Sequence, residues 1–106
     1  MTSPTGKLVR DRIPEIIRAS GTEPITYQAD PAEFRRRLRD KLPEEVDEFL
    51  TADDETAVEE LADILEVVYA LAADLGTTKD HLETTRAAKA AARGAFTNRV
   101  IWTGGS

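Results

Sequence analysis

The sequence contains no cysteine, which excludes disulfides, thiolate metal sites and a cysteine nucleophile. Its single histidine, His81, also excludes a zinc site built from several histidines of one chain. No apolar run approaches the roughly 20 residues that a membrane-spanning helix needs. The first residues lack the apolar stretch of a secretory signal peptide, so a cytoplasmic location is the expectation.

Positive charge is scarce as well, because 14 lysines and arginines stand against 20 acids and the net charge is −6. Nucleic acids and anionic membranes bind basic surfaces, so neither is expected as a partner. A small anionic ligand is still compatible with this balance, since a bound metal ion would reverse the local sign. We expect one domain over residues 1–106, whose modest core would gain from association with a second copy.

What the sequence does contain is a strong helical pattern between residues 31 and 76. Asp30 and Pro31 suit the start of a helix, whose apolar stripe is Phe34, Leu38, Leu42, Val46 and Phe49. Pro43 interrupts the stripe, so we expect either a bend near Asp40 or two helices that meet there. A second helix, ending at Gly76, carries the stripe Val58, Leu61, Ile64, Leu65, Val68, Leu71 and Leu75.

Shorter elements flank this hairpin. A short helix is expected between residues 13 and 20, and an alanine-rich helix between a cap at Thr77 or Thr78 and Gly94. Residues 25–28 and 96–102 have the β-branched and aromatic content of brief strands that could pair. We predict a mostly all-α fold with short terminal strand-like segments, whose helical hairpin forms a four-helix bundle on dimerisation.

Each helix of the hairpin carries two acids three residues apart, a spacing that places both on one face: Glu45 with Glu48, and Glu60 with Asp63. Taken singly, such a pair is more often a solvated helix face. At about 100° per residue, however, Glu45 falls inside the apolar sector of its helix, where an unpaired charge is costly. Four carboxylates that converge require a cation between them or protonation of some of them.

Ligands that are all oxygen, without histidine or cysteine, favour Mg²⁺, with Mn²⁺ as an alternative. Mg²⁺ in proteins usually keeps some water and completes its shell with substrate phosphates. The acidic groups therefore suggest a phosphorylated substrate and hydrolysis of a phosphoanhydride bond, for which a metal ion neutralises phosphate charge and activates water.

The motif Glu44-Glu45-x-x-Glu48 followed by Glu60-x-x-Asp63 resembles the signature of the all-α nucleoside triphosphate pyrophosphohydrolases. That superfamily includes MazG, the dimeric dUTPases and phosphoribosyl-ATP pyrophosphohydrolase. The opening KLVRDRIPEII, residues 7–17, and the close from Lys89 to Trp102 are similar to the ends of its small MazG-related members. The resemblance therefore covers nearly the whole chain.

The resemblance implies Mg²⁺-dependent cleavage of a nucleoside triphosphate between the α- and β-phosphates, giving a monophosphate and pyrophosphate, in a house-cleaning role. It implies that the metal ligands and catalytic residues are Glu45, Glu48, Glu60 and Asp63. An acid that is not fully committed to metal could act as the base for water. The opening segment is not usual for histidine-pathway enzymes, so the base and sugar of the substrate stay open.

Four basic residues near the ends of the chain are candidates for binding the triphosphate, because lysine and arginine recognise phosphate oxygens: Lys7, Arg10, Lys89 and Arg93. Their alternative role is surface ion pairing with the many acids. Two other functions fit the same sequence. One is a non-catalytic regulator that binds nucleotide or metal on this scaffold, and the other is a helical dimerisation module.

Overall fold

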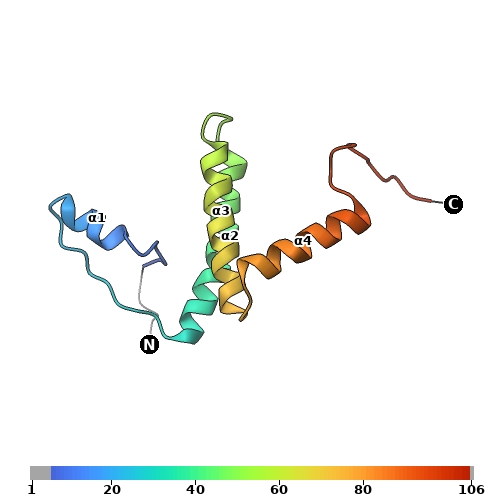
Figure 1. The fold of residues 1–106 in the computed structure, drawn as a ribbon. Coiled ribbons are helices and arrows are strands. Elements are labelled where there is room, and N and C mark those ends of the chain that lie inside the picture. Colours follow the sequence, from blue (N-terminus) through green and yellow to red (C-terminus); the bar gives the residue numbers. More distant parts are fainter. Residues whose placement is uncertain (1–5, 106) are drawn as a thin grey trace.

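Four α-helices make up the regular structure of the chain, and a computed structural model describes residues 6–105 (Figure 1). The helices are α1 (Ile13–Ala19), α2 (Pro31–Thr51), α3 (Ala57–Asp74) and α4 (Lys79–Arg93). Residues 6–105 contain no β-strand, so the predicted all-α fold is confirmed. None of the described helices is both long and apolar enough to cross a membrane.

Helix α2 begins and continues as its local sequence dictates. The Asp30 side chain accepts a hydrogen bond from the Glu33 amide at 2.8 Å, and Pro31 follows in the first turn. The helix runs without a break through Pro43, so the alternative of two helices meeting near Asp40 is wrong. Pro43 and Arg39, four residues earlier, are both exposed, so water can bind the Arg39 carbonyl that lacks its usual donor.

The ends of α3 and α4 also follow from capping. Gly76, with φ at +84°, ends α3 in a conformation that favours glycine, and its amide donates to the Ala73 carbonyl at 2.9 Å. Helix α4 is capped by Thr78, whose hydroxyl accepts a hydrogen bond from the His81 amide at 3.1 Å. Of the two predicted caps, Thr78 is therefore the one used.

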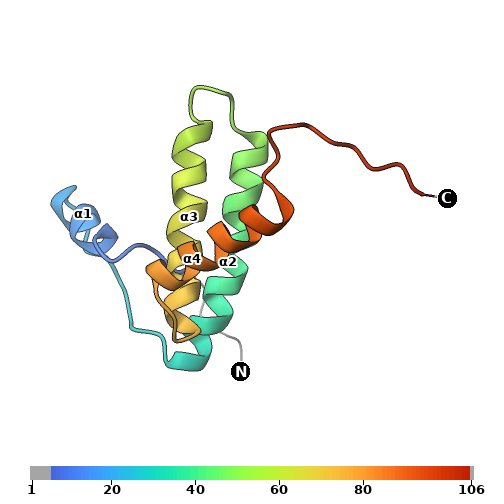
Figure 2. The ribbon, with the colours of Figure 1, turned by 45° about the vertical axis from the view of Figure 1, so that its right-hand side comes forward.

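Helices α2 and α3 fold back on each other as the predicted hairpin (Figure 2), but they bury little. The buried apolar residues are Leu38, Val67 and Ala72. Much of the stripe predicted to form the core of α3 is instead exposed, with Val58 at 73% and Leu61 and Leu65 near half. Among residues 6–105, helix α2 packs along α3 and α4 contacts only its end, so no described helix covers the remaining apolar face of α3.

The single chain is also unusually open. Its accessible surface is 9242 Å², whereas a folded monomer of 11.7 kDa exposes about 5,900 Å². Its radius of gyration is 18.1 Å, against about 13 Å for a compact chain of this length. Helix α1 packs against no other helix, and α4 packs only against α3. A single chain is thus far less compact than a typical monomer of its length, and its association into a four-helix bundle stays a prediction.

The segments predicted to be strand-like do not pair within the chain. Residues 23–29 and 100–105 form no backbone hydrogen bonds with other described residues. A turn closed by the Arg99 amide and the Phe96 carbonyl at 3.2 Å interrupts the second segment, and Arg99 has a φ of +56°. In both Figure 1 and Figure 2 the two segments lie on opposite sides of the hairpin, which explains why they cannot meet.

Candidate metal centre

The hairpin brings together the four acids that the sequence singled out. Glu45 and Glu48 come from α2, and Glu60 and Asp63 come from α3. One carboxylate oxygen of each residue lies within 4.8 Å of the corresponding oxygens of the other three. We call these four residues the acidic cluster. Their convergence agrees with the prediction from spacing and phase, while their role as metal ligands and catalytic residues stays a prediction.

The position of the acidic cluster follows from the symmetry of the hairpin. Glu48 lies three residues before the last residue of α2, and Glu60 lies three residues after the first residue of α3. Each partner acid is three residues farther from the turn, on the same helix face. The two pairs therefore sit at matching heights on antiparallel helices, and the short turn at residues 52–56 sets their register.

Two oxygens of the acidic cluster have no partner. Glu45 is only 7% exposed, and its Oε2 atom and the Oε2 atom of Glu60 are buried without a hydrogen bond among the described residues. A buried acceptor left unpaired costs about 1 to 3 kcal/mol, and more when it is charged. Carboxylate oxygens gathered in this way fit a hard divalent cation, whose coordination would satisfy both. The residues present therefore fit a metal ion.

Burial is the largest cause that raises the pKa of Glu45, and the neighbouring carboxylate of Glu48 raises it further. Lys41, one turn earlier on α2, places its Nζ atom 3.4 Å from Glu45 Oε1 and acts in the opposite direction. The pKa of Glu45 is raised overall, so Lys41 does not cancel the effects of burial and of the Glu48 carboxylate. Sequence analysis missed Lys41, although its spacing of four residues from Glu45 is a recognisable signal for an ion pair.

Of the predicted phosphate-binding residues, Arg10 contacts the acidic cluster and Lys7 lies near Glu44, the residue before Glu45. Arg10 donates through Nη2 to Asp63 Oδ1 at 2.6 Å, and the Lys7 Nζ atom lies 4.0 Å from Glu44 Oε1. Residues 7–13 line a cleft of about 700 Å³ together with parts of α2 and α3, including Glu45 and Asp63. Residues 7–13, which we call the basic segment, therefore line the same cleft as two acids of the acidic cluster.

The other two predicted residues lie elsewhere. Lys89 and Arg93 are exposed on α4, and neither lines this cleft nor pairs with an acid among residues 6–105. Figure 1 shows α4 leaving the hairpin on the side opposite α1. Within one chain, the structure does not bring these two residues to the acidic cluster.

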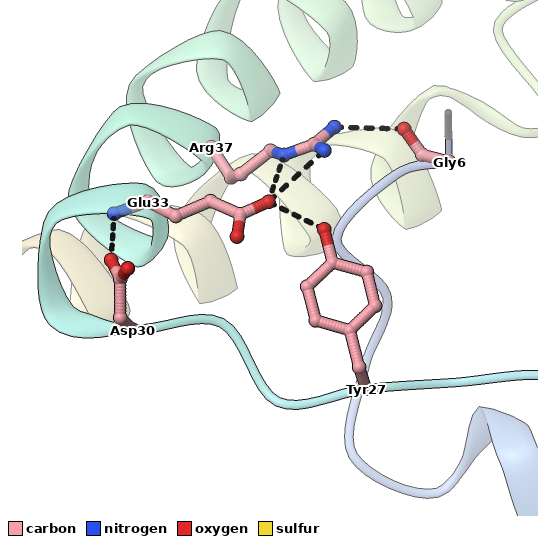
Figure 3. A network of polar contacts seen from close by, with 5 residues as sticks. All are labelled: Gly6, Tyr27, Asp30, Glu33 and Arg37. Atoms are coloured by element: carbon pink, nitrogen blue, oxygen red, sulfur yellow. Dashed lines mark hydrogen bonds and ion pairs between the residues drawn. The ribbon is translucent and has the colours of Figure 1, made fainter. Parts of the chain in front are cut away.

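A polar network holds the basic segment in place (Figure 3). Glu33 accepts a hydrogen bond from the Tyr27 hydroxyl at 2.6 Å and pairs with Arg37, which in turn donates to the Gly6 carbonyl at 2.8 Å. The Tyr27 hydrogen bond, followed by Arg37, holds the pKa of Glu33 below its ordinary value. The network thus fastens both the residue before Lys7 and the loop around Tyr27 to α2. Sequence analysis did not identify it.

Comparison with known proteins places these observations in context. A family model described as phosphoribosyl-ATP pyrophosphohydrolase matches residues 11–90, a range that contains the whole acidic cluster. An uncharacterized protein of Mycolicibacterium smegmatis (strain ATCC 700084 / mc(2)155) is 51% identical over 47 residues. That alignment covers 44% of this chain and 48% of the relative, so the match spans about half the length of the curated protein. No solved structure matches the chain.

Proposed function

The chain belongs to the phosphoribosyl-ATP pyrophosphohydrolase family, and from that premise we propose that it hydrolyses a nucleoside triphosphate or a related nucleotide. Cleavage falls between the α- and β-phosphates and releases a nucleoside monophosphate and pyrophosphate. The observation that carries the proposal is the acidic cluster, which has two unpaired buried oxygens and two members, Glu45 and Asp63, that line a cleft edged by basic residues. A non-standard nucleotide, removed in a house-cleaning role, is the substrate class we favour.

Glu45, Glu48, Glu60 and Asp63 would hold the metal ion, and their oxygen-only donor set favours Mg²⁺, with Mn²⁺ as the alternative. When bound, the ion would neutralise phosphate charge and lower the pKa of the attacking water. The remaining catalytic task of the chain is to accept a proton from that water as its oxygen attacks phosphorus. Glu48, the most exposed acid of the cluster, is best placed to meet solvent.

Arg10 and Lys7 are suited to hold the phosphate groups. The Arg10 guanidinium already lies at the acidic cluster, and only one of its N–H groups is engaged with Asp63 in the described contacts. Its remaining donors can bind phosphate oxygens. Lys7 is well exposed and only loosely paired with Glu44, so it can reach a charged group in the same cleft. These contacts would orient the triphosphate and balance the negative charge of the leaving pyrophosphate.

We also propose a homodimer in which the exposed apolar face of α3 packs against a second hairpin to form the four-helix bundle. The surface of the single chain exceeds that of a compact monomer by roughly 3,300 Å². Obligate dimers bury about 2,000 to 5,000 Å² in total, so this excess is large enough to supply such an interface.

Incubation with a panel of standard and modified nucleoside triphosphates tests the proposed reaction. In the presence of Mg²⁺ we expect a monophosphate and pyrophosphate in equal amounts from at least one nucleotide, and none after chelation by EDTA. Chromatography of the nucleotides together with a pyrophosphate assay measures both products. Nucleotide binding without either product would favour the non-catalytic regulator instead.

The basic segment yields a sharper prediction. Arg10→Ala should raise the KM for the preferred nucleotide about ten- to hundredfold, because a hydrogen bond to a charged group contributes about 1.5 to 3 kcal/mol. The matched control is Arg12→Ala, two residues away, since Arg12 pairs at 2.6 Å with Glu15 of α1 rather than with the acidic cluster. Steady-state kinetics of both variants measure the difference. Equal KM values for the Arg10→Ala and Arg12→Ala proteins would contradict the proposed role of Arg10 in binding phosphate.

A further inference from the structure

The C-terminal arm, residues 95–105, is the most exposed apolar part of the described chain. Its large apolar side chains are between 81% and 98% exposed, and they are Phe96, Val100, Ile101 and Trp102. Figure 1 shows the arm extending away from α4 without touching another element. Scattered apolar residues on a surface are ordinary, but four within seven residues form the kind of patch that marks an interaction site.

A second segment of the chain has the complementary property. Residues 24–28 are extended, Ile25 is fully exposed, and their backbone groups have no partner among residues 6–105. They form one wall of a cleft of about 860 Å³, which adjoins the cleft at the acidic cluster and shares residues 7–11, Ile13 and Phe34 with it. The other walls include apolar side chains of Val9, Ile13 and Ile17. We call this space the loop cleft.

The arm and the loop cleft match in chemistry. Residues 100–105 of the arm and residues 24–28 of the loop cleft both lie outside helices and turns, and neither segment has backbone partners among residues 6–105. Both also contain β-branched and aromatic residues. An extended segment that joins another as an added strand satisfies the backbone groups of both, while its side chains fill the adjoining cleft. The exposed face of α3 could bury the arm's side chains, but its backbone groups are already used within the helix. The loop cleft is therefore the better receptor.

The arm cannot reach the loop cleft of its own chain. Figure 1 and Figure 2 both place α1 and the loop that follows it on one side of the hairpin, and the arm on the other. We propose that the C-terminal arm docks as an added strand along residues 24–28 in the loop cleft of a second copy of this chain, so that two copies exchange arms. The roughly 3,300 Å² by which the chain exceeds a compact monomer is enough for both this contact and a helical interface.

Trp102 is the only tryptophan, so its fluorescence reports on the arm alone. We expect its emission to shift to the blue, and its quenching by acrylamide to fall several-fold, over the concentration range in which light scattering shows association. Dilution to the monomer should reverse both changes. An oligomer in which Trp102 is as accessible as in the monomer would overturn the proposal. Equally, a tryptophan already shielded in the monomer would show that the arm folds onto its own chain.

The absence of cysteine allows the receptor to be located by disulfide formation between chains. An Ile25→Cys protein is mixed under oxidising conditions with Val100→Cys, Ile101→Cys or Thr103→Cys protein, which covers the neighbouring registers. At least one mixture should give a covalent heterodimer. The control replaces Ile25→Cys with Val58→Cys, because Val58 is a similarly exposed apolar residue on α3. No heterodimer with Ile25→Cys, or an equal yield with Val58→Cys, would reject the loop cleft as the receptor.

Neither experiment uses catalysis. Failure of arm exchange is therefore distinguishable from failure of the proposed hydrolysis.

Discussion

Glu48→Gln is expected to lower pyrophosphate release by about 100-fold or more, since a bound metal contributes several kcal/mol to stabilising transition-state charge. The amide keeps the shape of the side chain but loses the negative charge that a divalent cation needs. Glu48 is the exposed member of the acidic cluster, so its replacement removes no buried contact and the hairpin should stay folded. Initial rates with the preferred nucleotide at saturating Mg²⁺, compared with circular dichroism of the same samples, separate activity from folding.

Asp47→Asn provides the matched control for this experiment. Asp47 is the preceding residue on α2, is exposed, and lies outside the acidic cluster, so its substitution makes the same change in net charge. It should retain wild-type activity. A Glu48→Gln protein that releases pyrophosphate at the wild-type rate would show that the acidic cluster is not the catalytic centre.

Glu45→Gln should have the second large effect, and it is a gain of stability. Without divalent ions at neutral pH, we expect the free energy of unfolding to rise by about 1 to 3 kcal/mol, because the substitution removes a buried charge whose Oε2 atom is unpaired and which Lys41 offsets only in part. The wild-type protein should in turn be stabilised by Mg²⁺, whereas the variant should lose most of that response. Thermal melting with and without Mg²⁺ measures both effects.

The difference in stability between Glu45→Gln and the wild-type protein should depend on pH, because the pKa of Glu45 is raised. Folding favours the protonated carboxyl, so the stabilisation it gives is fully present below the ordinary carboxyl pKa and is lost as the pH rises through the raised value. The gain in stability of Glu45→Gln over the wild-type protein should therefore be small in acid. It should grow as the pH rises from the ordinary carboxyl pKa through the raised pKa of Glu45. Asp47→Asn again controls for net charge, and a Glu45→Gln protein that melts no higher than this control would contradict the conclusion that the buried Glu45 carboxylate destabilises the fold.

The hairpin and its acidic cluster could be predicted because both depend on local periodicity. Apolar spacing gave the positions of the two helices, and the phase of Glu45 within that spacing indicated that it would be buried. The cover of α3 could not be predicted in the same way. Periodicity identifies an apolar face but not the element that packs on it, so Leu61 and Leu65 were assigned to a core that a single chain does not complete.

The basic residues also separate what the sequence predicts from what only the tertiary structure determines. Arg10 reaches Asp63 because residues 6–12 follow an irregular path along the hairpin, and the Tyr27, Glu33 and Arg37 network fixes that path through contacts distant in sequence. An irregular segment has no periodic pattern in its sequence from which its course could be predicted. Charge and position along the chain selected Lys7 and Arg10 together with Lys89 and Arg93, but only the tertiary structure separates the two pairs.

The small core has a consequence for the amount of protein a cell must make. With Leu38, Val67 and Ala72 as the buried apolar residues, a solitary copy gains little free energy from folding. If association completes the fold, as we propose, stability becomes a function of concentration rather than a fixed property of the chain. Copies that are too dilute to meet a partner would then be removed by proteolysis, which ties the lowest useful level of the protein to its own affinity for itself.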